Sequence, residues 1–221
     1  MFVSDWMTKI VFTVTPDEHV SDAVKLMEEA GIKHLPVVKN ERVMGMISDR
    51  DIKEFTPSKA TTLDVYELHY LLAKTKVKEV MKINVITIPP DTPVEEAAMT
   101  MHDRKIGCLP VVDDHRLVGI ISDSDIFRIL VDITGIRHGG RRMCLTLEDR
   151  PGSIKEVADI VRQFGFSLLS ILTSYEGMAP GYRRVVIRIK GKGDFKGLKQ
   201  ELEKSPALCS EVSFKEGQDL P

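Results

Sequence analysis

The sequence predicts an α+β chain in which two β-α-β-β-α repeats pack as a pair and a β-α-β-β-α-β domain follows them. Three observations support this prediction. Residues 3–55 align with residues 77–129 at a constant offset of 74, without a gap. Each copy combines short β-branched runs with an amphipathic helical pattern. After residue 136 the pattern changes, which indicates a second kind of domain.

Each copy of the repeat shows the same order of elements. A β-branched run is followed by an amphipathic helix, two strands around a polar turn, and a helix that begins near Asp51 or Asp125. The expected strands are Val11–Val14, Leu35–Val38 and Val43–Ile47 in the first copy, and Val85–Ile88, Leu109–Val112 and Leu117–Ile121 in the second. The helix faces expected to be buried are Val20, Ala23, Val24 and Met27, and Val94, Ala97, Ala98 and Met101.

Thr92, Pro93 and Glu95 predict where the helix of the second copy begins. Threonine at the N-cap with glutamate at the third helical position is a capping box, and proline is well tolerated at the first position. A repeat of about 50 residues buries only a modest part of its surface alone, so we expect the copies to pack sheet to sheet. Residues 57–76 between them are expected to form a helical connector.

The last third of the chain predicts the second domain. The expected strands are Met143–Leu147, Leu168–Tyr175, Arg183–Lys190 and Glu211–Phe214, and Phe195–Glu203 is an expected helix. Ser153 and Glu156 indicate a capping box that opens another helix, which Gly165 ends. This order is the ferredoxin-like arrangement. The expected boundaries are repeats at 1–56 and 77–135, a connector at 57–76, a linker at 136–142, the last domain at 143–216 and a tail at 217–221.

Composition and spacing exclude several functions. A formal charge of -2 argues against a nucleic-acid coat, and the basic stretch Arg137, His138, Arg141 and Arg142 is expected to be a solvated linker. Cys108, Cys144 and Cys209 are widely spaced in strand-like runs, which favours buried thiols in a reducing cytoplasm. No apolar run reaches a membrane span of about 18 residues. The histidines lack metal-ligand spacing, and no nucleophile elbow or phosphate-binding lysine loop occurs, so we expect neither a metal nor an enzyme.

Two motifs occur in both copies. Leu35–Val38 (LPVV) returns as Leu109–Val112, and Gly45–Asp51 (GMISDRD) returns as Gly119–Asp125 (GIISDSD). With the preceding threonine-containing strand, this pattern resembles the tandem cystathionine-β-synthase (CBS) domain pair, or Bateman module, over residues 1 to 133. The turn at Asp149–Ser153 (DRPGS), the GFS segment from Gly165 and the element order resemble an ACT domain. The whole arrangement, with the connector from Thr56, resembles the acetoin-utilisation B-type proteins.

The CBS resemblance implies sites for adenosine compounds between the two repeats. The family's serine and aspartate, which hold ribose or phosphate, correspond to Ser48 and Asp51 and to Ser122 and Asp125. A carboxylate accepts two hydrogen bonds from a diol, and a helix N-terminus offers N–H groups to a phosphate. The alternative is that the serines only cap helices and the aspartates strengthen the first turn.

The resemblance also implies further contacts. Thr13 and Thr87 lie in the segment that contacts adenine in the family; the alternative is an ordinary edge threonine. Lys33, His34 and Arg50 are replaced in the second copy by Gly107, Cys108 and Ser124. We therefore expect the first site to tolerate a polyphosphate and the second to favour less charge. The alternative is that Lys33 and Arg50 are solvated surface residues.

In ACT domains the first turn forms an amino-acid site at a dimer interface, which corresponds here to Asp149, Gly152 and Ser153. Because Ser167 and Leu168 replace the usual asparagine and isoleucine, a purely dimerising role is favoured over amino-acid sensing.

Together these features predict a cytoplasmic, non-enzymatic homodimer that senses AMP, ADP, ATP or S-adenosylmethionine as a regulatory ligand, without a cofactor. The linker around Asp132–Arg142 would transmit the bound state to the ACT domain. Its expected partners are the adenosine nucleotide and a regulated metabolic enzyme, with no nucleic acid and no membrane. The alternative is a structural adaptor of an acetoin-pathway or other metabolic enzyme complex that binds no nucleotide.

Overall fold

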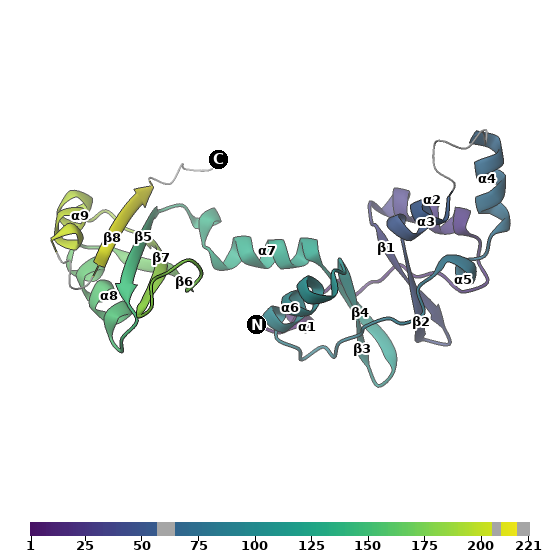
Figure 1. The fold of residues 1–221 in the computed structure, drawn as a ribbon, viewed down its shortest axis with the longest axis horizontal. Helices are drawn as coiled ribbons and strands as arrows, with labels where there is room; N and C mark the ends of the chain where they lie inside the picture. Colours follow the sequence, from purple (N-terminus) through teal and green to yellow (C-terminus); the bar gives the residue numbers. More distant parts are fainter. Residues whose placement is uncertain (57–64, 205–208, 216–221) are drawn as a thin grey trace. The chain divides into compact units, whose positions relative to one another are not determined.

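A computed structural model describes residues 1–56, 65–204 and 209–215 (Figure 1). The chain divides into two compact units, Met1–Ile126 and Phe127–Pro221. The first unit holds α1 (Val3–Trp6), α2 (Val20–Ala30), β1 (His34–Lys39), β2 (Arg42–Ser48), α3 (Asp49–Phe55), α4 (Val65–Lys74), α5 (Val77–Val80), α6 (Val94–Arg104), β3 (Cys108–Asp113) and β4 (Arg116–Ser122). Helix α7 (Asp123–Ile133) begins in the first unit and ends in the second.

The two repeats have matching strand pairs. β1 and β2 form one antiparallel pair and β3 and β4 form another, each with a register shift inside its Val-Val step. The strands predicted at these positions are confirmed, and each extends by one residue at both ends. Most of the predicted helix faces are also confirmed, because Val20, Ala23 and Met27 on α2 and Val94, Ala97 and Met101 on α6 are buried. Val24 and Ala98, also expected to be buried, are half-buried. Alternating apolar positions on β1 and β2 close the small core beneath α2.

The first strand of each repeat is much shorter than predicted. Val14 forms a single parallel bridge with Val37, and Ile88 forms the matching bridge with Val111. Val14 N donates to Pro36 O at 3.1 Å, and Val38 N donates to Val14 O at 2.8 Å. The ladder does not continue toward the N-terminus, because the next donors on β1 and β3 would be Pro36 and Pro110, and proline has no N–H to donate.

The two repeats exchange their leading segments: the segment before the first repeat pairs with the second repeat, and the segment before the second repeat pairs with the first. Thr8 pairs with Ile120 of β4, whereas Lys82 pairs with Met46 of β2. The short helix α1 is tied to the second repeat by Val3 N donating to Thr92 O at 2.9 Å. β2 and β4 are in contact, and Leu117 N donates to Glu41 O at 3.2 Å. The two copies therefore share one fold through exchanged segments rather than standing as separate units.

Two strand glycines allow this exchange. A Cβ on Gly45 would lie 2.8 Å from both Lys82 O and Met81 Sδ, and a Cβ on Gly119 would overlap the side chain of Met7. The GxxSxxD motif carries glycine at these positions because the exchanged segment passes directly over the strand.

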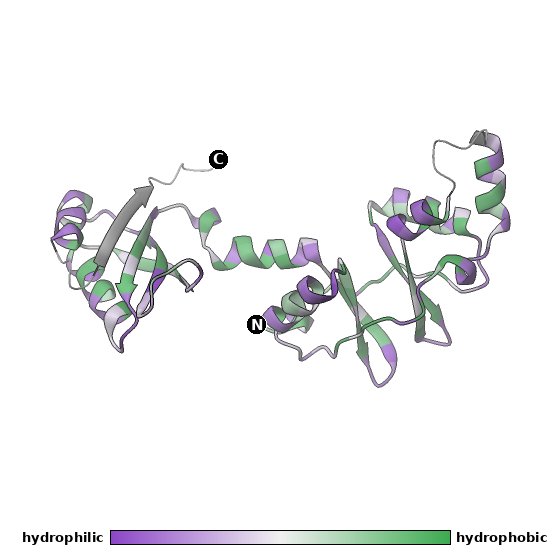
Figure 2. Cartoon of the chain, viewed as in Figure 1, coloured by the Kyte–Doolittle hydropathy of each residue, from purple (hydrophilic) through white to green (hydrophobic). Residues whose placement is uncertain are grey.

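The second unit is a four-stranded antiparallel sheet in the order β6-β7-β5-β8. Its elements are η1 (Ile136–His138), β5 (Arg141–Glu148), α8 (Ser153–Gln163), β6 (Ser167–Ser174), β7 (Tyr182–Lys190), α9 (Phe195–Glu203) and β8 (Cys209–Lys215). α8 and α9 lie on one face of the sheet (Figure 1), each with alternating polar and apolar bands (Figure 2). Their buried faces pack on Leu145 and Ile187 of the central strands. The ferredoxin-like prediction is confirmed.

Both helix caps predicted from threonine and serine are wrong. α6 begins at Val94 with Pro93 as its N-cap, and Thr92 Oγ1 instead donates to Pro89 O at 2.8 Å. α8 begins at Ser153 with Gly152 as its N-cap, and the Ser153 hydroxyl is taken by an arginine of β7. The Thr92 hydroxyl is thus engaged by a carbonyl three residues earlier, and the Ser153 hydroxyl by a residue of another strand.

Three further predictions need correction or qualification. Arg141 and Arg142 belong to β5 and are half-buried, so the basic stretch is not wholly a solvated linker. Arg141 lies over the Phe195 ring, with Cζ 4.2 Å from the ring centroid, a cation–π contact. Cys144 is half-buried rather than buried. The helical connector is confirmed by α4 over Val65–Lys74, and its residues 57–64 lie outside the described residues.

Candidate ligand-binding site

Ser48 and Asp51 form a complete capping box at the start of α3. The Asp51 N–H donates to Ser48 Oγ at 3.2 Å, and the Ser48 N–H donates to Asp51 Oδ2 at 2.9 Å. The Ser48 hydroxyl also donates to Asp51 Oδ2. Both side chains are buried. We call this group, with the cation described below, the Asp51 site.

Ser122 and Asp125 repeat this arrangement at the start of α7, and we call them the Asp125 site. Ser122 N and Ser122 Oγ donate to Asp125 Oδ2 at 3.0 and 2.8 Å, and Asp125 N donates to Ser122 Oγ at 3.3 Å. The capping interpretation made from the sequence is therefore confirmed in both copies. It leaves a ligand role open, because each cap engages mainly one carboxylate oxygen.

Lys82 completes the Asp51 site and was missed by the sequence analysis. Its Nζ lies 2.6 Å from Asp51 Oδ1, and the Asp51 side chain is only 6% exposed. Burial raises the pKa of Asp51, but the hydrogen bonds from Lys82 and Ser48 and the Lys82 charge together outweigh it and hold this pKa below its ordinary value of 3.8. The carboxylate is therefore charged at neutral pH. The sequence did contain one signal for this residue. At the repeat offset of 74, Lys82 aligns with Thr8, so the two copies differ in charge at this position.

His34 lies between the repeats, against the chain at Gly107. A Cβ on Gly107 would be 3.1 Å from His34 Cε1 and 3.6 Å from Asp123 Oδ2. Burial lowers the pKa of His34, and the charges of Asp123, Asp49 and Asp51 only partly oppose this. His34 is therefore a neutral hydrogen-bonding group at pH 7 rather than a fixed cation.

Cys108 occupies the position of His34 in the second copy and is buried. Burial, and then the charge of Asp123, raises the pKa of the Cys108 thiol to about 12. The second copy thus presents an uncharged, inert side chain where the first presents an imidazole.

The remaining predicted contacts are spread over the surface of the first unit. Thr13 and Thr87 are exposed, in the stretches that cross from one repeat to the other. Arg50 is exposed and its Nε donates to Glu54 Oε1 at 3.0 Å, so the structure engages it within its own helix. Lys33 is exposed, and its carbonyl accepts from Asp49 N at 3.0 Å. His34 is the register partner of Ser48 across β1 and β2, so the structure brings His34, Ser48 and Asp51 together.

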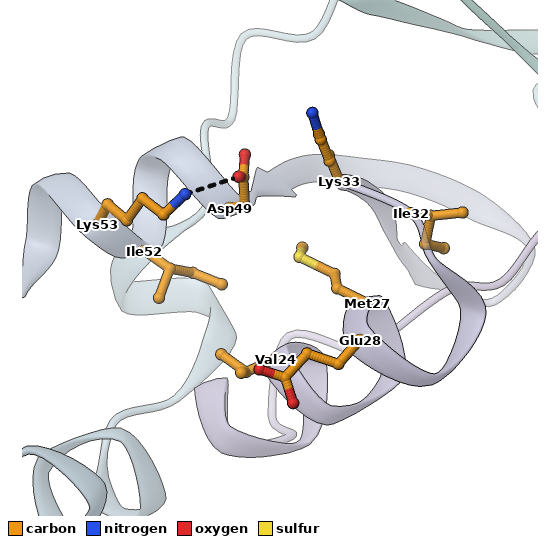
Figure 3. Close-up of a pocket in the computed structure, with 8 residues that line it drawn as sticks. All are labelled: Val24, Met27, Glu28, Ile32, Lys33, Asp49, Ile52 and Lys53. Atoms are coloured by element: carbon orange, nitrogen blue, oxygen red, sulfur yellow. Dashed lines mark hydrogen bonds and ion pairs between the residues drawn. The ribbon is translucent and has the colours of Figure 1, made fainter. Parts of the chain in front are cut away.

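A pocket of about 310 Å³ lies between α2 and α3 of the first repeat (Figure 3). Its floor is apolar and its rim is charged, with Lys53 paired to Asp49 at 3.0 Å. The lining residues are Val24, Met27, Glu28, Ile32, Lys33, Asp49, Ile52 and Lys53. It shares Lys33 with the predicted site, whereas the serine and aspartate of the Asp51 site do not line it.

The turn predicted as the ACT site is tied to the sheet by one arginine. Arg183 Nη2 donates to Ser153 Oγ at 2.8 Å, and Arg183 Nη1 lies 3.4 Å from Asp149 Oδ1. Ser153 is only 1% exposed, and Gly152 has a positive φ of 90°. Asp149, Gly152 and Ser153 are therefore gathered in one place, with the serine hydroxyl already bonded inside the domain.

A second buried arginine holds the segment that leads into the sheet. Arg188 is 8% exposed; its Nε donates to Thr134 O at 3.1 Å and its Nη1 to Gly139 O at 3.3 Å. Ser170 Oγ also donates to Thr134 O, at 2.8 Å. The C-terminal end of α7, where carbonyls lack helical partners, is thus fixed to β6 and β7.

Neither a metal centre nor a membrane span is found in the described part of the chain. Among residues 1–56, 65–204 and 209–215, no three His, Cys, Asp or Glu side chains converge to hold an ion. No helix in these ranges has the length and apolarity needed to cross a bilayer.

The matching strand pairs and the repeated serine-aspartate caps define a tandem-repeat protein with a separate ferredoxin-like domain. The chain belongs to the CBS domain family, whose model matches residues 3–57 and 77–132. Residues 139–210 match a TTHA0829-like ACT domain. The two domain types are those expected from the motifs.

Known relatives resemble the repeated part. The structure of acetoin utilization protein AcuB from Vibrio cholerae is 34% identical, with a TM-score of 0.53, and covers 62% of this chain and 96% of that chain. The CBS domain pair of protein MJ0100, solved with 5-methylthioadenosine and S-adenosyl-L-methionine, is 30% identical, with a TM-score of 0.50, and covers 60% of this chain and 97% of that chain.

A homoserine O-acetyltransferase from Methanosalsum zhilinae is 36% identical over 130 residues, which is 58% of this chain. The chain spans only 24% of that enzyme's length. The likeness to this enzyme is therefore confined to a small part of it, and CBS and ACT domains are regulatory rather than catalytic families.

Proposed function

We propose that this protein is a non-catalytic regulator that senses an adenosine ligand at its Asp51 and Asp125 sites. The observation that carries this proposal is the repeated capping box, which places a carboxylate at the first turn of a helix in both copies. The N–H groups of such a turn attract a phosphate, and the carboxylate accepts hydrogen bonds from a ribose diol. The CBS pair of MJ0100, with bound adenosine compounds, supports this ligand class.

The two sites are proposed to prefer differently charged ligands. Lys33 and His34 lie beside the first site, while Gly107 and Cys108 take their places in the second. AMP, ADP or ATP therefore suits the first site, and a less charged compound such as S-adenosylmethionine suits the second. Arg50 is the weakest of the predicted contacts, since Glu54 already binds it.

The bound state is proposed to reach the ACT domain through α7. Asp125 lies in the first turn of this helix, and Arg188 binds the carbonyls that follow its last turn. A ligand that reorients the first turn would displace the far end of the helix, because a hydrogen-bonded helix moves as a rigid element.

The ACT domain is proposed to dimerise rather than to bind an amino acid. Ser153 is buried and its hydroxyl accepts from Arg183, so this part of the predicted amino-acid site is already satisfied within one chain. Most soluble oligomers are symmetric homodimers. Sedimentation of the isolated 139–215 fragment beside the whole protein would test this assignment.

The likeness to AcuB favours a second candidate, an adaptor that assembles with an acetoin-pathway or other metabolic enzyme without sensing a nucleotide. In that case Asp51→Ala and Asp125→Ala would leave partner binding unchanged, and nucleotides would have no effect on it.

A thermal-shift panel of AMP, ADP, ATP, S-adenosylmethionine and 5-methylthioadenosine tests the sensing function. A ligand that binds only the folded state raises stability by about 2.7 kcal/mol at a concentration 100-fold above its Kd. We expect at least one compound to raise the melting temperature. No response at millimolar concentrations of all five would reject adenosine sensing and leave the adaptor.

A further inference from the structure

Lys82 forms an ion pair with the Asp51 carboxylate, the group that a ribose would bind at the Asp51 site. Its ammonium lies 2.6 Å from Asp51 Oδ1, and this oxygen has essentially no solvent-exposed surface. The other oxygen, Oδ2, accepts from the backbone and hydroxyl of Ser48. A diol can therefore reach Asp51 only if the Lys82 ammonium moves away.

The two partners differ in their freedom to move. Asp51 is fixed by its capping bonds and is 6% exposed, whereas the Lys82 side chain is 67% exposed. Lysine carries a compact charge on a flexible four-carbon stem, so Lys82 can leave the carboxylate without disturbing the backbone bridge between Lys82 and Met46. A ligand that displaces the ammonium but offers it no new partner loses the ion pair and gains only the diol contact.

We propose that Lys82 makes the Asp51 site selective for a phosphate-bearing adenosine ligand, whose phosphate accepts the ammonium that its ribose displaces from Asp51. This inference rests on the proposed adenosine sensing and adds the residue, Lys82, that makes the first site require a phosphate. An ammonium–phosphate contact is a charge-assisted hydrogen bond, which is stronger than a neutral one.

The repeat offset provides an internal comparison. Thr8 occupies the position of Lys82 in the other copy, and it pairs with Ile120 of β4 as Lys82 pairs with Met46 of β2. A threonine carries no charge to exchange between a carboxylate and a phosphate. The Asp125 site therefore has no ammonium at this position that a phosphate could accept.

Other cations near the first site are less suited to this role. Arg50 is engaged by Glu54, and Lys53 is engaged by Asp49. His34 has a lowered pKa and is neutral at pH 7. The exposed Lys33 is the one competing candidate from the sequence analysis, so it becomes the comparison in the test.

The test measures AMP and adenosine binding by titration calorimetry in full-length Asp125→Ala protein, in which the Asp51 site alone remains. We expect AMP to bind about tenfold or more tightly than adenosine, as one charge-assisted contact provides. Adding Lys82→Met should reduce this ratio to less than about threefold. Lys33→Met in the same background should leave the ratio largely intact.

The reverse exchange is the matched control. In full-length Asp51→Ala protein the Asp125 site remains, and Thr8→Lys should raise its AMP-to-adenosine ratio by about tenfold. If Lys82→Met lowers the melting temperature too far for calorimetry, Lys82→Thr restores the residue that the other copy uses and serves in its place.

An unchanged AMP-to-adenosine ratio in the Lys82 variants would overturn the inference while leaving adenosine sensing intact. A ratio that collapses with Lys33→Met but not with Lys82→Met would overturn it in favour of Lys33. Wild-type protein that binds neither compound nor any other adenosine ligand would reject the proposed function itself.

Discussion

The imidazole of His34 lies against Gly107, at the position where the first copy carries Lys33. Because Gly107 of the second copy has no side chain, the His34 ring of the first copy occupies the space beside it. Cε1 of His34 would be 3.1 Å from a Cβ at Gly107, so an alanine would push on the ring. The difference between the copies is therefore also a packing feature of the interface between the repeats.

The first prediction concerns pH. Burial lowers the pKa of His34 below its ordinary 6.5, so the folded protein resists a proton that the unfolded chain accepts. Stability from this group is complete above pH 6.5 and is lost as pH falls through the lower, folded-state pKa. Urea unfolding should show a free energy of unfolding that falls as the pH drops below about 6.5.

His34→Asn should flatten this slope, whereas the exposed His102→Asn should not. Asp51 does not interfere, because its pKa is lowered and its contribution is lost only below its ordinary value of 3.8. An identical slope in wild-type and His34→Asn protein would contradict the assignment of a buried neutral imidazole.

The second prediction uses the two strand glycines. Gly45→Ala places a Cβ 2.8 Å from the backbone oxygen of Lys82, which cannot move without shifting the exchanged segment. Gly119→Ala meets only the flexible side chain of Met7. We expect Gly45→Ala to cost about 1–3 kcal/mol and Gly119→Ala clearly less, as measured by urea denaturation. Equal costs would argue against the close backbone approach at Gly45.

The third prediction concerns thiol reactivity. Burial, with the charge of Asp123, raises the pKa of Cys108 to about 12, so its thiolate is scarce at pH 8. Peptide mapping after iodoacetamide treatment should find Cys108 unmodified in the folded protein and modified in denaturant. Rapid alkylation of Cys108 without denaturant would show that the first unit opens at this strand.

The fourth prediction concerns the end of α7. Arg188→Met leaves the carbonyls of Thr134 and Gly139 without their guanidinium donor, which should cost about 1–3 kcal/mol in thermal or urea unfolding. Arg184→Met, at an exposed position of the same strand, is the control and should change stability by less than about 0.5 kcal/mol. Equal effects of the two changes would remove Arg188 as the residue that fixes α7 to the sheet.

The sequence was sufficient for the paired strands of each repeat, β1 with β2 and β3 with β4, and for most helix positions. The short continuous apolar runs Leu35–Val38 and Leu109–Val112 are typical of buried strands, and the structure places strands at both. The G-x-x-S-x-x-D motif likewise indicated, as one of two interpretations, that Ser48 and Ser122 cap helices, since these bonds are local along the chain.

The features that the sequence analysis missed depend on tertiary contacts. Lys82 reaches Asp51 because the segment before the second repeat crosses onto β2, and no local pattern encodes that crossing. Ser153 was expected to cap a helix, but Arg183 of β7 donates to its hydroxyl. Thr92 is a local exception, because its hydroxyl donates to the carbonyl of Pro89 three residues earlier. Aligning the two copies would have pointed to Lys82, because it is charged where the other copy has Thr8.

Calorimetry with AMP and S-adenosylmethionine on three proteins tests the central claim most directly: wild type, Asp51→Ala, and the double variant Asp51→Ala with Asp125→Ala. We predict that the wild type binds ligand at both sites, that the single variant loses one of them, and that the double variant binds neither compound. Undiminished binding by a folded double variant would contradict the assignment of the repeated aspartates as the ligand sites.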